Sequence, residues 1–354
     1  MFLTDEKHLA LPEVIVSGNE LGASDIDIAP NKPVIMRVDG RIAPLGEGYI
    51  VKEEDTVALL NAYLSKSARE KYENRRSYDT SIQVEQSRTR LHFYESIDGT
   101  CLSCRLIPPK PRKMDELLLP PVLKDWVRRK GIIVISGLTN TGKTTTLASL
   151  VDYVNSTRNE KIMILEDPIE FIHTDKKSCI FQREIGMHSP SYADALKDVA
   201  RENTDIVVVG EVRSKQAMDA VFSMAEAGLS VFTSVHANSA METVERIVNL
   251  FPPLDYERIY HRMSWTLVGI ANQELLPRPS GGRVLACEIV TCNQAVKNAL
   301  RTGKIHNIQN LLDTGGSDWC LLMPIEAVWK RGGCCEVSKS RTYTPSSNPS
   351  NRCL

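Results

Sequence analysis

One short segment constrains this chain more than any other: a glycine-bounded loop between an apolar strand pattern and a helical pattern. The β-branched run Ile132–Ile135 precedes the loop Gly137–Thr144, whose sequence is GLTNTGKT, and helical spacing follows over Thr145–Val154. A glycine-rich loop in this setting binds phosphate, because its backbone N–H groups and the positive end of the helix dipole face an anion. An ordinary strand-to-helix turn is the alternative, and the flanking strand and helix favour the phosphate-binding loop.

The loop residues are expected to share the work of holding a polyphosphate and its metal ion. Lys143 would reach the β- and γ-phosphate oxygens of ATP, and Thr144 would offer its hydroxyl to Mg²⁺. Gly142 must be small so that the backbone can approach the phosphates. The nucleotide-binding positions expected in this segment are Gly137, Thr139, Asn140, Thr141, Gly142, Lys143, Thr144 and Thr145.

Length and charge set the bounds for the rest of the chain. Its 354 residues are enough for two domains, each with its own core. A formal net charge of -1 gives no electrostatic indication of a nucleic-acid partner. The first residues lack the basic start and apolar run of a signal peptide, and no apolar stretch is long enough to span a membrane. We therefore expect a cytoplasmic protein.

Nine cysteines are scattered along the chain. A chain of this size does not need disulfides, so reduced thiols are expected. Cys101 and Cys104 have the spacing of half a zinc ribbon. No second pair completes the set and the flanking residues have a strand pattern, which favours a structural role over a metal site.

The first hundred residues alternate short strand patterns with turns. Strands are predicted over Val34–Val38, Arg90–Tyr94 and Cys101–Ile107, and the apolar spacing of Glu54–Arg69 predicts one helix between the first two. Together they predict an α+β domain.

Proline-rich sequence after residue 107 marks a change of composition, as is typical of a segment between folded units. We expect an N-terminal domain over 1–108, a linker over 109–116, a second domain over 117–337 and a disordered tail over 338–354, where serine and proline replace a core pattern.

The second domain alternates strand and helix patterns, which is typical of an α/β fold. Strands are predicted at Ile132–Ile135, Lys161–Leu165, Ile206–Val209 and Val231–Val235, and helices at Ala193–Arg201 and Lys215–Ala227. Short apolar runs separated by helices predict a parallel sheet covered on both faces, and ligands of such sheets lie at the carboxyl ends of the strands.

Polar residues follow three of these strands and are expected to converge on Lys143. Glu211 follows the third strand, where a nucleotide hydrolase keeps the carboxylate that organises Mg²⁺ or water. Glu170 is the better candidate to polarise the attacking water, because Glu166 directly ends its strand, although spacing leaves the choice between them open. His236 could hydrogen-bond the γ-phosphate, or it could be an ordinary polar residue of a loop.

Four motifs in order now carry a resemblance to a known family. They are GLTNTGKTTT, ILEDPIEF, VVVGEVRS and GLSVFTSVHANSA. Their order is similar to that of the PilT-type retraction ATPases of type IV pili, within the superfamily of type II and type IV secretion ATPases. The likeness extends from the N-terminal segment Ser24–Ile28 to Ala295–Arg301, which resembles the family's C-terminal helix.

The resemblance implies a fold, an activity and an assembly. A smaller N-terminal PAS-like α+β domain would precede a C-terminal RecA-like P-loop NTPase domain in an α/β chain. Six copies would form a homohexameric ring that hydrolyses ATP with Mg²⁺ and works against an inner-membrane pilus or secretion platform protein. Such a ring lies at the cytoplasmic face of the bacterial inner membrane, associates with the membrane only through its partners and needs no nucleic acid.

The resemblance also implies roles for single residues. Lys143 and Thr144 match the phosphate-loop positions, Glu170 the catalytic glutamate and Glu211 the acidic residue of the second Walker motif. His236 matches the second histidine of the histidine box.

Outside the ATPase motifs, Arg90 and Arg105 match N-terminal-domain arginines that reach the nucleotide. Three positions depart from the family pattern: Leu229 stands for the first histidine of the histidine box, His92 for an arginine and Ser214 for an acidic residue.

Two other functions stay open. Similar ATPases energise type IVB secretion or conjugal transfer, and motifs alone do not separate these from pilus retraction. A DNA translocase on the same core would call for a basic, aromatic-bearing channel, which the composition does not suggest.

Overall fold

The computed structural model describes residues 9–38, 40–45, 49–85, 87–107, 110–277, 282–308, 310, 319–322, 330–331 and 334–335. Contacts between residues divide the chain into two units, 1–110 with 170–172 and 111–169 with 173–354. The expected domain boundaries and the linker 109–116 stay predictions. The expected tail 338–354 lies outside the described residues.

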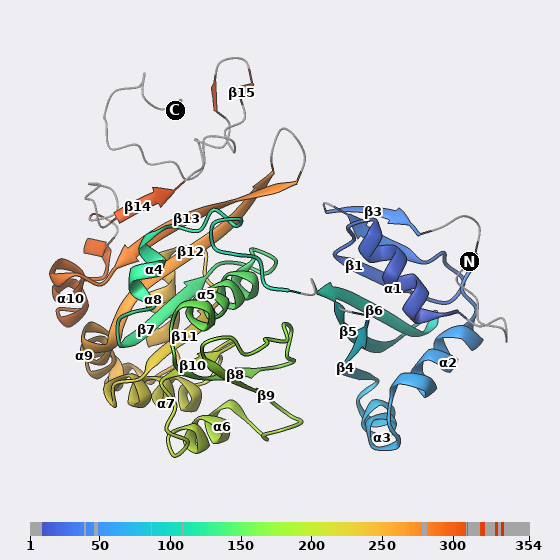
Figure 1. Cartoon of the computed structure of the whole chain (residues 1–354), viewed down its shortest axis with the longest axis horizontal. Coiled ribbons are helices and arrows are strands. Elements are labelled where there is room, and N and C mark those ends of the chain that lie inside the picture. The colour runs from blue at the N-terminus through green and yellow to red at the C-terminus, as the bar shows by residue number, and fades with distance from the viewer. Residues whose placement is uncertain are drawn as a thin grey trace. The chain divides into compact units, whose positions relative to one another are not determined.

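An antiparallel sheet of six strands organises the first unit, in the order β3-β2-β1-β6-β5-β4 (Figure 1). Its elements are α1 (Leu11–Glu20), β1 (Asp25–Ile28), β2 (Ile35–Val38), β3 (Arg41–Pro44), α2 (Glu53–Tyr63), α3 (Lys66–Arg75), β4 (Ser77–Val84), β5 (Ser87–Ser96) and β6 (Gly99–Ile107). Along β5, buried Leu91 and Phe93 alternate with the more exposed Arg90 and His92. The period of two places one face of the sheet in the core and leaves arginine on the other.

The helix expected over Glu54–Arg69 is two helices, so that prediction was wrong. Helix α2 ends at Tyr63 and α3 begins at Lys66, because Leu64 is extended and Ser65 accepts a hydrogen bond from the backbone N–H of Ala68 at 3.2 Å. A serine that caps a new helix outweighs continuous apolar spacing.

The second unit contains a sheet of eight strands in the order β14-β13-β12-β7-β11-β10-β8-β9 (Figure 1). Its strands are β7 (Gly131–Ser136), β8 (Lys161–Glu166), β9 (Cys179–Glu184), β10 (Ile206–Val209), β11 (Ser230–Val235), β12 (Leu267–Pro277), β13 (Arg283–Thr291) and β14 (Trp319–Leu322). Its helices are α4 (Val122–Trp126), α5 (Lys143–Thr157), α6 (Tyr192–Val199), α7 (Lys215–Glu226), α8 (Ala240–Val248), the 3-10 turn η1 (Pro253–Asp255), α9 (Tyr256–Thr266) and α10 (Gln294–Arg301). A short pair, β15 (Lys330–Arg331) and β16 (Cys334–Cys335), forms a separate ladder.

Both faces of this sheet are buried, as the apolar strand runs predicted. Val207 and Val209 of β10 face a core built with α6, α7, α8, α9 and α10, while Ile206 and Val208 face the core that includes α4 and α5. The α/β fold is therefore confirmed.

The expectation of a parallel sheet holds for six strands and is wrong for the sheet as a whole. Strands β12, β7, β11, β10, β8 and β9 run parallel, but β13 pairs antiparallel with β12 and with β14. Only residues 278–282 separate β12 from β13, and so short a connection cannot make the crossover that parallel strands need.

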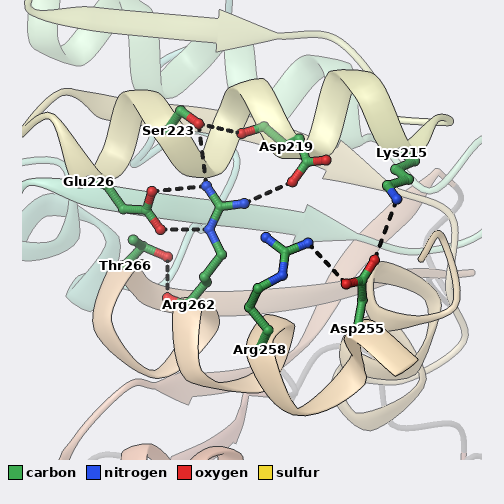
Figure 2. Close-up of polar contacts among 8 residues, drawn as sticks. All are labelled: Lys215, Asp219, Ser223, Glu226, Asp255, Arg258, Arg262 and Thr266. Atoms are coloured by element: carbon green, nitrogen blue, oxygen red, sulfur yellow. Dashed lines mark hydrogen bonds and ion pairs between the residues drawn. The ribbon is translucent and has the colours of Figure 1, made fainter. Parts of the chain in front are cut away.

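A half-buried arginine holds α9 against α7 on one face of this sheet (Figure 2). Arg262 of α9 donates to Asp219 at 2.8 Å and to both carboxylate oxygens of Glu226 at 2.6 and 2.9 Å. Its guanidinium lies 4.8 Å from the ring centre of Phe222. Because α9 leads directly into β12, this contact anchors β12 to the helix that follows β10.

Candidate functional site

The phosphate loop joins the end of β7 to the start of α5. Gly137, Asn140 and Gly142 have positive φ angles of 149°, 65° and 86°, which glycine adopts without steric cost and asparagine tolerates. A Cβ atom at position 137 would lie 2.5 Å from the carbonyl oxygen of Gln273. The loop therefore requires glycine at its first position for space as well as for backbone conformation.

Lys143 is the first residue of α5, and its side chain bends back into the loop. The residue is only 8% exposed, and its ammonium donates to the carbonyl oxygens of Gly137 at 3.0 Å and Leu138 at 2.7 Å. Thr141 closes the same turn by donating to the Leu138 carbonyl at 2.8 Å. Two carbonyl oxygens of the loop thus hold the positively charged ammonium of Lys143 inside the loop.

The other predicted loop residues surround this charge. Thr139 and Asn140 are exposed at the tip of the loop, and Thr144 and Thr145 lie half-buried in the first turn of α5. The backbone N–H groups of a first helical turn have no partner within the helix, so this end of α5 suits an anion.

His236 links the loop to the end of β10. Its Nδ1 lies 3.4 Å from the Lys143 ammonium, and its Nε2 lies 3.3 Å from a carboxylate oxygen of Glu211. Burial lowers the pKa of His236, the cation of Lys143 lowers it further, and the Glu211 carboxylate opposes both. A neutral imidazole fits this arrangement, because Nδ1 accepts from the ammonium while Nε2–H donates to the carboxylate. The expected convergence of Lys143, Glu211 and His236 is confirmed.

Arg213 is a member of the site that the sequence interpretation did not assign. Its guanidinium donates to Glu211 at 2.6 Å, and this hydrogen bond raises the pKa of Arg213. Glu211 therefore receives bonds from two directions, with Arg213 on one oxygen and His236 on the other. The position of Arg213 two residues after Glu211 was the available signal, since a long cationic side chain so close in the chain can reach that carboxylate.

Glu166 lies beside the same strand end. A Cβ atom at position 210 would lie 3.3 Å from Glu166 Cγ, which puts the Glu166 side chain next to the residue preceding Glu211. Burial raises the pKa of Tyr192, and the carboxylates of Asp167, Glu166 and Glu211 raise it further, so all three are near this phenol.

Glu170 belongs to the segment 170–172 of the first unit. Its expected place beside Lys143 stays a prediction, as does its role relative to Glu166.

Arg90 and Arg105 lie directly opposite each other on β5 and β6. Each guanidinium is paired with a carboxylate: Arg90 Nε lies 3.1 Å from Asp79, and Arg105 Nε lies 3.1 Å from Asp25. The two arginine side chains are 33% and 43% exposed, so two cations stand side by side on the solvent face of this sheet. Their expected contact with a nucleotide stays a prediction.

The three departures from the family pattern have structural roles of their own. Ser214 caps α7 by accepting from the Ala217 N–H at 3.2 Å. His92 lies 3.2 Å from Asp79, and Leu229 packs against the core before β11. A serine at position 214 keeps the helix cap but brings no charge to the loop that follows Glu211.

Oxygen donors in the loop and at the end of β10 suit a hard cation. The Thr144 hydroxyl and the Glu211 carboxylate are the donor types that Mg²⁺ prefers, usually alongside phosphate oxygens and water. Within the described part of the chain, no group of three or more His, Cys, Asp or Glu residues could hold a metal by itself. Cys101 and Cys104 are buried in β6.

No helix among the described residues is long and apolar enough to cross a membrane.

The fold and this loop together define a P-loop nucleotide-binding protein of the α/β class. The chain belongs to the family of Type II/IV secretion system proteins, whose family model matches residues 10–312.

Individual relatives confirm the expected resemblance to PilT-type ATPases. The type IV pilus retractation ATPase PilT of Pseudomonas aeruginosa is 32% identical over 321 residues, which cover 88% of this chain and 92% of that protein. A twitching motility protein of Neisseria gonorrhoeae is 34% identical over 265 residues, covering 74% of this chain and 71% of the relative.

Solved structures agree with this assignment. The pilus retraction motor PilT with bound ADP matches with a TM-score of 0.78 and 36% identity, over 86% of this chain and 89% of that one. The ATPase DotB of Legionella pneumophila matches with a TM-score of 0.74 over 87% of this chain and 88% of that one, and at 24% identity it supports the fold alone.

Proposed function

We propose that this chain is the ATP-hydrolysing motor of a type IV pilus system and powers pilus retraction. The observation that carries the proposal is the hydrogen-bonded series Lys143–His236–Glu211, at 3.4 and 3.3 Å, beside a glycine-bounded loop. Similarity over most of the chain to proteins described as a pilus retraction ATPase and a twitching motility protein supports the pilus assignment.

The proposed chemistry assigns each polar group of the site a part. ATP is the substrate, with its phosphates against the loop backbone, the N-terminus of α5 and the ammonium of Lys143. Thr144 and Glu211 would hold Mg²⁺, which when bound neutralises charge on the transferring phosphoryl group. We assign His236 the detection of a γ-phosphate, and its contacts with both Lys143 and Glu211 support this role.

Glu170 is our proposed catalytic glutamate, with Glu166 as the alternative. Family position favours Glu170, whereas the closeness of Glu166 to the Glu211 strand end favours the alternative. Arg90 and Arg105 would supply two guanidinium groups to the nucleotide from the first unit, since both are partly exposed on one sheet face.

For the whole molecule we propose a RecA-like ATPase domain preceded by a PAS-like domain, assembled as a homohexamer at the cytoplasmic face of the bacterial inner membrane. Its partner would be the inner-membrane platform protein of the pilus, and no nucleic acid would be needed. A motor of type IVB secretion or conjugal transfer is the second candidate, and the fold shared with DotB is the observation that keeps it open.

The first test is ATP hydrolysis by the purified protein. We expect slow phosphate release that requires Mg²⁺, and loss of that activity in both Lys143→Ala and Glu211→Gln. The first substitution removes the cation that faces the phosphates, and the second removes the anion between His236 and Arg213. Unchanged turnover in both variants would refute the ATPase assignment.

A further inference from the structure

Two consecutive polar residues are buried in the middle of β12, where an apolar pair would pack more simply. Asn272 is 3% exposed and Gln273 is 1% exposed. Asn272 pairs with Ser136, the last residue of β7, and Gln273 is the next residue along β12. Because successive side chains of a strand point to opposite faces, each of the two serves a different face. A buried amide costs free energy unless hydrogen bonds replace those it made to water.

Gln273 contacts the phosphate loop at Gly137 and the helix that follows it at Thr146. Its Nε2 donates to the hydroxyl of Thr146 at 2.7 Å, and Thr146 lies on α5 one turn after Lys143. The backbone N–H of Thr146 in turn donates to the Gly142 carbonyl at 2.9 Å. The carbonyl oxygen of Gln273 occupies the space next to Gly137 that a Cβ atom would need. One residue therefore supports both ends of the loop.

Asn272 supports the segment His236–Ala237, which we call the histidine segment, from the face of the sheet opposite to Gln273. Its Nδ2 donates to the Ser136 hydroxyl at 3.1 Å and to the carbonyl of Ala237 at 3.0 Å. Ser136 is the last residue of β7 before the loop, and Ala237 follows His236 directly. The Thr243 hydroxyl of α8 lies 2.7 Å from the Ser136 hydroxyl and ties the start of that helix to the same point.

The buried amide of Gln273 is not optimised for stability. Its Oε1 is buried and receives no hydrogen bond from a nitrogen or oxygen donor among the described residues, and its neighbour across the strand pair is the Cys287 thiol, a weak donor. An unsatisfied buried acceptor costs more than an apolar side chain of the same shape would. A requirement other than folding is a physical reason to keep the amide there.

We propose that Asn272 and Gln273 are positioning residues that set the distance between Lys143 and His236. Gln273 holds the loop and α5, and Asn272 holds the segment after His236. Because the two residues are consecutive on β12, they fix these segments relative to each other and so keep the 3.4 Å contact between Lys143 and His236. This inference rests on the proposed function, because it assigns these residues to the same nucleotide site.

The test compares the two brace residues with a matched control. Gln273→Met and Asn272→Leu remove the amides at similar volume. Thr291→Val is the control, since Thr291 of β13 accepts a buried hydrogen bond from Trp126 Nε1 at 3.2 Å in the same unit but touches neither loop. The melting temperature should fall by a few degrees in Thr291→Val, which loses one buried hydrogen bond, and further in Asn272→Leu, which loses two. Gln273→Met loses one hydrogen bond together with a buried acceptor, so its melting temperature should change less.

Only the brace variants should change nucleotide chemistry. Binding of a fluorescent ADP analogue should weaken about three- to tenfold in Gln273→Met, the range one hydrogen bond supplies. In Asn272→Leu, ADP affinity should stay near that of the wild type, while kcat for ATP should fall about tenfold because the histidine segment loses its register. Thr291→Val should leave both quantities unchanged.

Two results would overturn the proposal: wild-type ADP affinity and kcat in both brace variants, or equal losses in Thr291→Val. If Gln273→Met does not fold, Thr146→Val removes the same hydrogen bond from the other side and should weaken ADP binding, whereas Thr146→Ser keeps the hydroxyl and should restore most of it. A wild-type protein that binds ADP but does not hydrolyse ATP would refute the proposed function alone, because the ADP comparison still tests the brace.

Discussion

Replacing Arg262 by alanine should destabilise the second unit more than any other single surface-charge change on α9. The guanidinium is 15% exposed and makes hydrogen-bonded ion pairs to Asp219 and Glu226 of α7, the latter bidentate (Figure 2). It also covers the ring of Phe222 at 4.8 Å from the ring centre. The substitution therefore removes ion pairs and packing together.

The magnitude follows from the exposure of the partners. The Asp219 and Glu226 side chains are 36% and 43% exposed, so water can replace the guanidinium and each ion pair is worth only about 0.5–1 kcal/mol. The cation–π contact and the lost stem packing add about 1 kcal/mol. We expect a total loss of about 2–3 kcal/mol in the free energy of unfolding, equivalent to a lower melting temperature by about 5–10 °C.

Arg258 offers a matched control on the same helix. Its side chain is 51% exposed and makes one ion pair, to Asp255 at 3.4 Å (Figure 2). Arg258→Ala should cost at most about 0.5 kcal/mol.

Urea unfolding followed by tryptophan fluorescence measures both variants. Residues 1–110 contain no tryptophan, whereas Trp126 and Trp265 belong to the second unit. Losses for Arg262→Ala and Arg258→Ala within about 0.5 kcal/mol of each other would refute the claim that burial and bidentate geometry set the strength of this contact.

Three further predictions concern pH, catalysis and coupling. Burial lowers the pKa of His173 to about 4 from 6.5, so the unfolded chain binds a proton that the folded chain refuses between these values. Stability should therefore fall by about 3 kcal/mol as pH drops from 6.5 to 4, and His173→Gln should flatten that slope in urea titrations. Glu170→Gln should keep ADP affinity and lose ATP turnover, and a larger catalytic loss in Glu166→Gln would reverse our assignment. Replacing Lys297 and Arg301 of α10 by alanine should leave the hexamer and its ATPase activity intact, as measured by size-exclusion chromatography and phosphate release. The same variant should lose the pilus or transfer phenotype in cells. A wild-type phenotype would show that α10 has only a structural role.

The sequence by itself determined the parts of this protein whose signals are local. Thirteen positions specify a strand, a phosphate loop and the start of a helix. They do so through a run of β-branched residues, two glycines and a lysine, because these three local structures depend on neighbouring residues. The strand Ile206–Val209 was predicted with its observed bounds, and Glu211 follows from it. Apolar spacing was less reliable over Glu54–Arg69, where the local cap at Ser65 decided the outcome.

The tertiary structure alone decided which distant residues meet. His236 reaches Lys143 across 93 positions, and Gln273 reaches Thr146 across 127. Such contacts depend on strand order, with β12 and β11 on either side of β7, and periodicity within a strand carries no information about its neighbours. The same reason explains why Asn272 and Gln273 escaped notice: a polar residue in a strand becomes part of a site only when the sheet brings a second loop within hydrogen-bonding distance.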